Sequence, residues 1–134
     1  MTIFEGKNIR ISWDAKVECV VSEMEGFAEG EEYRNALEKG LESLELNRSR
    51  KWLGDMTRGS LMSQDDAKWV QADWRPRAAR AGLRWTALVM TNNALGKMQI
   101  DRMTRTVAEY EGSSIETAYF DNQEEAKAWL QSQG

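Results

Sequence analysis

The chain has 134 residues, a net charge of −4 and no histidine, so it fits one domain (1–134) and lacks His-based triads and the usual zinc sites. Its single cysteine excludes an internal disulfide and favours a cytoplasmic location, and no apolar run is long enough to span a membrane. Because the chain is acidic overall and carries no recognised reader motif, we expect no nucleic-acid partner.

The first half of the chain begins with strand patterns and continues with a helix. Residues 3–11 predict two short extended pieces around a glycine-containing turn, and residues 17–21 predict a strand because their β-branched side chains alternate. We expect residues 24–30 to form a loop. The clearest helix follows, and its apolar face holds Tyr33, Leu37, Gly40, Leu41 and Leu44.

A second strand and helix follow this helix. Residues 51–55 predict a short strand that ends at Asp55. Ser63 can cap the next helix, with Asp66 three positions later. Pro76 is expected to kink this helix, and Gly82 to end it in a left-handed conformation.

The last part of the chain repeats the strand–helix order twice. Residues 85–90 are apolar on both faces, as a central parallel strand requires. We expect a helix over residues 100–112, a strand over 115–120, and a final helix capped by Asp121 with Glu124.

This alternation predicts an α/β fold with right-handed crossovers. We expect a mostly parallel sheet of four to five strands, one antiparallel N-terminal strand and about four helices. One core is expected to hold Leu37, Leu41, Leu44, Val70, Trp74, Leu88, Val89 and Leu130.

Three strings of the sequence resemble one family. Residues 51–55, 69–83 and 120–130 are similar to a strand, the second helix with its exit turn, and the closing helix of the SpoIIAA-like family, which belongs with the STAS domains. The resemblance implies a strand–helix superhelix related to the anti-sigma factor antagonists and to the lipid-binding core of CRAL-TRIO proteins. The antagonists carry an Asp-Ser-Ser-Gly type string that is phosphorylated. Residues 55–63 lack that string, so we expect no phosphorylation switch at Thr57, Ser60 or Ser63.

A sheet with sequential strand order places its crossover helices on one face. We expect the other face to be covered by the first helix, a loop, a second subunit or an apolar ligand. Residues 26–28 and 56–62 are candidate lids. The candidate ligand contacts are Trp52, Met56, Trp69, Leu88, Met90 and Tyr119.

Basic residues gather in the middle of the chain. Residues 47–105 hold twelve basic and five acidic side chains, whereas residues 14–46 hold ten acidic and three basic ones. This separation can mark an anion-binding face, or helices of opposite charge that screen one another, and we favour the second interpretation. The candidate contacts to an anion or a protein partner are Arg75, Arg77, Arg80 and Arg84.

The remaining candidates have structural interpretations. Cys19 alternates with Val17 and Val21, which predicts a buried, unreactive thiol. We find no catalytic constellation, and expect neither a cofactor nor a metal site. The sequence therefore predicts a non-catalytic module that binds a small apolar or lipid-like ligand. A regulatory domain that docks a protein partner is the alternative, and a homodimer stays open.

Overall fold

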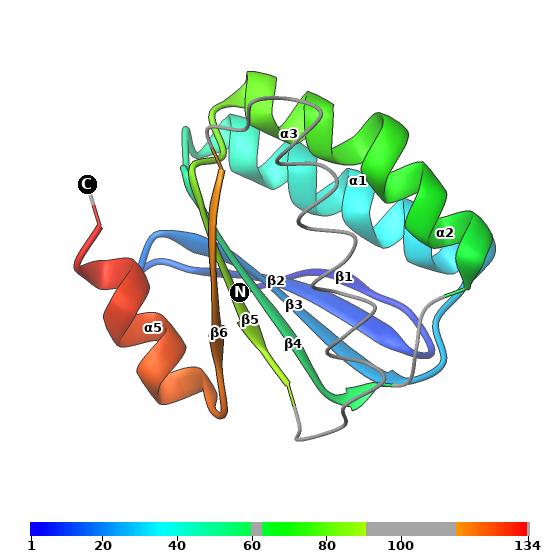
Figure 1. The fold of residues 1–134 in the computed structure, drawn as a ribbon, viewed down its shortest axis with the longest axis horizontal. Helices are drawn as coiled ribbons and strands as arrows, with labels where there is room; N and C mark the ends of the chain where they lie inside the picture. Colours follow the sequence, from blue (N-terminus) through cyan, green and yellow to red (C-terminus); the bar gives the residue numbers. More distant parts are fainter. Residues whose placement is uncertain (60–62, 91–114, 134) are drawn as a thin grey trace.

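The computed structural model describes residues 1–59, 63–90 and 115–133, which form a sheet with helices on both faces (Figure 1). Six strands follow one another across the sheet in sequence order. The first three pair antiparallel, and the third to the sixth pair parallel. Their bounds are β1 (Thr2–Glu5), β2 (Ile9–Asp14), β3 (Cys19–Gly26), β4 (Lys51–Gly59), β5 (Trp85–Val89) and β6 (Glu116–Phe120). The α/β class with an antiparallel N-terminal part is confirmed.

The sheet is larger than the sequence pattern predicts. It has six strands instead of four to five, because both opening pieces join it as a hairpin. The predicted loop starts too early, since β3 continues to Gly26 and buries Met24. The strand predicted to end at Asp55 continues to Gly59, so Met56 belongs to β4 and not to a lid.

The helices on one face of the sheet are α1 (Gly30–Leu46), α2 (Gln64–Trp69) and α3 (Arg75–Ala81), with a π-helical turn, η1 (Val70–Trp74), between the last two. All five residues of the predicted α1 stripe are buried. The Ser63 hydroxyl accepts a hydrogen bond from the Asp66 N–H at 3.1 Å, which confirms the predicted cap. The disturbance expected at Pro76 lies just before it, in η1, because proline cannot donate to the preceding turn. Gly82 ends α3 with φ at +117°.

Helix α5 (Gln123–Gln131) covers the opposite face of the sheet (Figure 1). It is capped one residue later than predicted: the Asn122 side chain, not that of Asp121, accepts the hydrogen bond from the Glu125 N–H. The position is decided by the extended backbone at Asn122, which aims the side chain at the first turn.

The prediction of one shared core is wrong, because the buried apolar residues divide into clusters on the two faces of the sheet. Successive residues of a strand point to opposite faces, so Trp52 packs under α1 and α3, whereas Leu53 packs under α5. Leu88 and Val89 are separated in the same way, and Leu130 belongs to the α5 side. We call the layer of α1, α2, η1 and α3 the first layer, and α5 the second layer.

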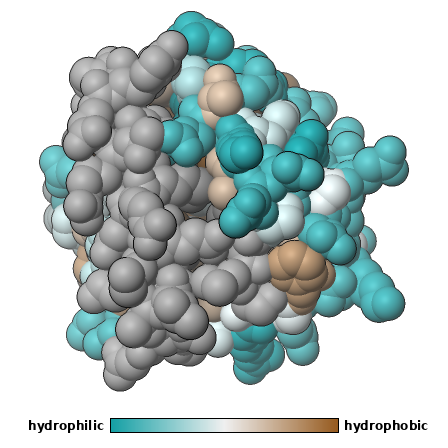
Figure 2. Space-filling model, turned by 45° about the vertical axis from the view of Figure 1, so that its right-hand side comes forward, coloured by the Kyte–Doolittle hydropathy of each residue, from teal (hydrophilic) through white to brown (hydrophobic). Residues whose placement is uncertain are grey.

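The surface in Figure 2 shows isolated hydrophobic residues among hydrophilic ones in the described part of that view. Within the described ranges, no helix has the length and apolar character that crossing a membrane requires. The helix expected over residues 100–112 and the end of the proposed 56–62 lid lie outside the described residues.

Candidate ligand-binding site

A cavity of about 70 Å³ lies between the sheet and the first layer. Its sheet wall includes Trp52, Gly54, Met56 and Leu88, and its helix wall includes Tyr33, Leu37, Val70, Trp74 and Arg75. Protein interiors hold few voids larger than a water molecule. This cavity is therefore a distinct feature of the core between the sheet and the first layer.

Two tryptophans form part of the cavity wall. Trp52 and Trp74 meet edge to face, with ring centroids 5.0 Å apart and an interplanar angle of 78°. The Trp52 indole N–H donates to the Ser22 hydroxyl at 3.1 Å, and the Trp74 indole N–H donates to the Leu37 carbonyl at 2.9 Å. Both rings are fixed in orientation, because each buried N–H has its acceptor.

Close packing on α1 holds the Trp52 ring from the other side. A Cβ atom placed on Gly40 would lie 2.2 Å from Trp52 Cη2, a distance that real Cβ atoms essentially never show. Glycine at this helix position is therefore required by the approach of the ring, and the wall of the cavity has little freedom to move here.

Two buried polar atoms on the cavity wall have no hydrogen-bond partner among the described residues. One is Nε of Arg75, which is 5% exposed, and the other is Oγ1 of Thr86, which is 4% exposed. Unpartnered buried polar atoms are uncommon in proteins and costly. Burial lowers the pKa of the Arg75 guanidinium, but a guanidinium stays charged at neutral pH.

The six predicted ligand contacts are only partly brought together. Trp52, Met56 and Leu88 line the cavity. Met90 and Tyr119 pack beside Met56 and Leu88 in an adjoining cluster. Trp69 lies apart from the cavity, where the guanidinium of Arg34 stacks over its ring at 5.3 Å.

These residues also do not lie on the face where they were expected. We expected Trp52, Leu88, Met90 and Tyr119 to line the face that the crossover helices leave open. Trp52 and Leu88 instead face the first layer, and α5 covers the opposite face of the sheet. The reason is the alternation along β4 and β5, which aims Leu53 and Val89 at α5.

The four predicted arginines do not form one surface cluster. Arg75 points into the cavity, whereas Arg77 forms ion pairs with Glu38 of α1 and Asp73 of η1. Arg80 is exposed. Arg84 comes after the end of α3 at Gly82, so it does not share a helix face with Arg77 and Arg80. Its Nη1 donates to the Leu83 carbonyl at 3.2 Å.

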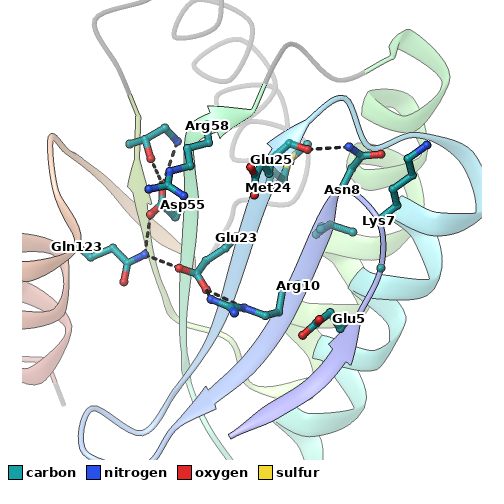
Figure 3. A pocket seen from close by; sticks show the side chains of 13 residues that line it. Glu5, Lys7, Asn8, Arg10, Glu23, Met24, Glu25, Asp55, Arg58 and Gln123 are labelled. Carbon is teal, nitrogen blue, oxygen red and sulfur yellow. Dashed lines mark hydrogen bonds and ion pairs between the residues drawn. The ribbon is translucent and has the colours of Figure 1, made fainter.

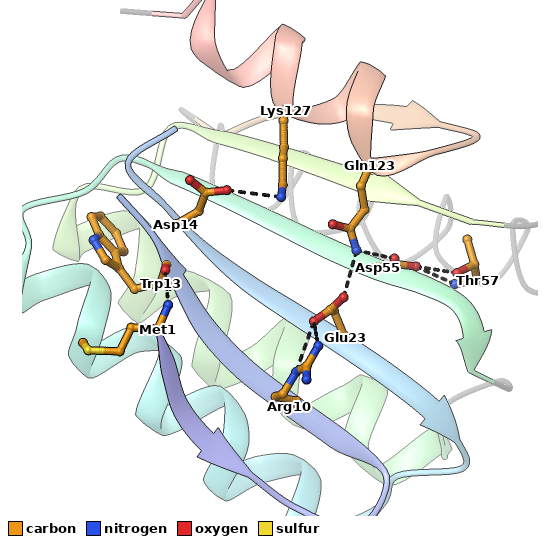
Figure 4. Close-up of polar contacts among 9 residues, drawn as sticks. All are labelled: Met1, Arg10, Trp13, Asp14, Glu23, Asp55, Thr57, Gln123 and Lys127. Atoms are coloured by element: carbon orange, nitrogen blue, oxygen red, sulfur yellow. Dashed lines mark hydrogen bonds and ion pairs between the residues drawn. The ribbon is translucent and has the colours of Figure 1, made fainter. Parts of the chain in front are cut away.

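A second, polar cleft of about 540 Å³ lies where β2, β3 and β4 approach the start of α5 (Figure 3). The Gln123 side-chain amide donates to Asp55 Oδ2 at 2.6 Å and to Glu23 Oε2 at 3.0 Å (Figure 4). Arg10 Nη2 donates to Glu23 Oε1 at 2.7 Å, and Thr57 donates twice to Asp55 Oδ1. All four carboxylate oxygens of Glu23 and Asp55 therefore already accept hydrogen bonds.

This network attaches α5 to the sheet. A second contact does the same: the Lys127 ammonium lies 3.2 Å from Asp14 Oδ2 (Figure 4). Burial raises the pKa of Glu23, but the hydrogen bonds from Arg10 and Gln123 lower it by more, so its pKa lies below the usual range. We take the cavity rather than the cleft as the candidate site, because Glu23, Asp55 and Gln123 of the cleft satisfy one another, whereas the cavity wall holds buried polar atoms without a partner among the described residues.

Thr86 and Tyr33 are among the wall residues of the cavity that sequence reasoning missed. Tyr33 was recognised only as a core residue, and no sequence signal distinguishes Thr86 from the other residues of a buried strand. The sequence predicts Arg75 only as a contact to an anion or a protein partner. Arg75 lies three residues before the buried Ala78 of the same helix, and this spacing is the signal that it faces inward.

Among solved structures, the fold is similar to that of an uncharacterized protein of the DUF3478 family with a SpoIIAA-like fold from Shewanella loihica PV-4. The two superimpose with a TM-score of 0.61 at 18% sequence identity, over 95% of this chain and 97% of that one. The chain thus has a SpoIIAA-like fold, as its strings predict. No protein-family model matches the chain, and no curated protein matches it in sequence.

Proposed function

We propose that the protein is a non-catalytic module that binds a small apolar ligand in the cavity under α1 and α3. The observation that carries this proposal is an unfilled space of about 70 Å³ between two fixed tryptophan rings and the side chains of Leu37 and Leu88. Burial of apolar surface in such a space is the usual source of affinity for small ligands.

The size of the cavity limits the ligand. An engineered apolar cavity that holds benzene measures about 150 Å³, about twice the volume found here. A whole lipid tail does not fit beside the rings. A six-carbon chain is no smaller than benzene, so it fits only if Met56 moves and enlarges the cavity. Met56 is suited to this because its side chain is unbranched, flexible and only half-buried.

The proposal is tested by titrating the protein with 1-hexanol and with hexanoate while tryptophan fluorescence is recorded. We expect a saturable change for at least one of them, because Trp52 and Trp74 line the cavity. Native mass spectrometry of the purified protein should detect any small ligand that is retained.

A matched pair of variants locates the binding. Gly54 lines the cavity, and a Cβ atom placed on it would lie 3.0 Å from Leu88 Cδ2 of the same wall. Asn35 is exposed on α1 and does not line the cavity. Gly54→Ala should weaken binding and Asn35→Ala should not. Absence of saturable binding by the wild type, or an equal effect of the two variants, contradicts the proposal.

Docking of a protein partner through the arginines has less support. Arg75 is buried, and Arg77 is occupied by two acidic side chains. This alternative stays a prediction, for which a partner captured by the wild type and lost by Arg80→Ala is the test.

A further inference from the structure

Arg75 is a buried cation without an anion among the described residues. Its side chain is on the cavity wall, its residue is 5% exposed, and none of the ion pairs of the described residues includes it. Buried guanidinium groups in proteins are normally paired with a carboxylate. The missing anion is the first indication that the ligand of the cavity carries a negative charge.

No carboxylate among the described residues forms an ion pair with Arg75. The groups that raise the pKa of Arg75 against the effect of its burial are Tyr33 and Tyr119, and both are phenols. Burial raises the pKa of Tyr33, which keeps its hydroxyl neutral. The buried carboxylate of Asp66 accepts instead from the Gly30 N–H at 2.9 Å and from Arg34 Nε at 3.1 Å.

Thr86 adds a second, independent donor on the opposite wall. It lies on β5 and is 4% exposed, and its hydroxyl has no hydrogen-bond partner in the part of the chain that the structure describes. The sheet wall and the helix wall of one small cavity therefore each present an unused donor. One carboxylate has two oxygens, and can accept from a guanidinium fork and a hydroxyl together.

We propose that the ligand of this cavity is a small carboxylic acid with a short apolar chain, whose carboxylate binds Arg75 and Thr86. This inference rests on the proposed function, and it assigns the chemical class of the ligand. The apolar chain occupies the space beside Trp52 and Leu88. A carboxylate fits better than a phosphate, because the space is small and a doubly charged group costs more to remove from water.

The test compares two ligands of equal chain length, hexanoate and 1-hexanol, on the wild type by fluorescence and calorimetry. We expect hexanoate to bind at least about tenfold more tightly, the factor that corresponds to 1.4 kcal/mol. Equal affinities overturn this inference and leave the proposed function standing. Binding of neither ligand overturns both.

Variants then identify the groups that recognise the acid. Arg75→Met keeps the unbranched stem of the side chain and removes the guanidinium with its charge, so it should bind both ligands equally. Thr86→Val should weaken hexanoate several-fold and leave 1-hexanol unchanged. Arg80→Met, on the exposed side of the same helix, is the control and should behave like the wild type. A preference for hexanoate that persists in Arg75→Met overturns the assignment, and circular dichroism verifies that each variant is folded.

Discussion

Substitution of Gly40 by alanine is a direct test of the packing that fixes the cavity wall. The new methyl group would lie 2.2 Å from Cη2, 2.8 Å from Cζ3 and 3.2 Å from Cζ2 of Trp52. The ring cannot easily move away, because its N–H is bonded to Ser22 and its face is met by the Trp74 ring. The helix and the sheet must therefore separate locally.

Two opposing effects determine how much Gly40→Ala changes the free energy of unfolding. In an unhindered helix interior, alanine is more stable than glycine by about 1 kcal/mol. Overpacking of a close-packed core typically costs about 1–3 kcal/mol, and contacts of this closeness belong at the upper end. We expect Gly40→Ala to lower the free energy of unfolding by about 2 kcal/mol.

Urea unfolding of four proteins measures this effect: the wild type, Gly40→Ala, Trp52→Phe and the double variant. Phenylalanine lacks the outer part of the indole, so the alanine should be tolerated or stabilising in the Trp52→Phe background. Asn35→Ala, at an exposed site of α1, is the control and should change stability little. If Gly40→Ala is as stable as the wild type, or is equally harmful in both backgrounds, the packing argument is refuted.

Three further predictions concern other parts of the fold. The pKa of Glu23 lies below its usual range in the folded state, so its contribution to stability is complete above the pKa of the unfolded chain and is lost as the pH falls through the folded value. Glu23→Gln should therefore flatten the decline of the unfolding free energy between about pH 5 and pH 3, and an unchanged acid profile would argue against this. Asn122→Ala should cost about 1 kcal/mol in urea unfolding and Asp121→Ala much less, because only Asn122 caps α5, and the reverse order would restore Asp121 as the cap. Cys19 is fully buried and its pKa is raised to about 12, chiefly by burial, so it should react with a thiol reagent only after unfolding, and rapid labelling of the native protein contradicts this.

The fold could be predicted where local chemistry decides it. The α1 stripe, the Ser63 cap and the Gly82 helix end all follow from the side chains at those positions, and each is confirmed. The parallel placement of β5 follows from its apolar residues on both faces. These features depend on short spacings within one element.

The predictions that failed depend on contacts between elements. Trp52 and Leu53 are adjacent in sequence, but their assignment to different cores requires knowing which helix covers each face. The periodicity of the sequence predicts that neighbouring side chains of a strand point to opposite faces of the sheet. It does not predict on which face α5 packs. For the same reason, Arg75 was grouped with its charged neighbours, whereas its environment is set by β4 and β5.

The position of α5 has a consequence for the order of folding. This helix comes after every strand in the chain, and it alone among the described helices packs on Leu53 and Val89. Until α5 docks, none of the described helices covers that face of the sheet. Exposed apolar surface of this kind favours self-association during folding. Docking of α5, secured through Gln123 and Lys127, is the step that ends this exposure.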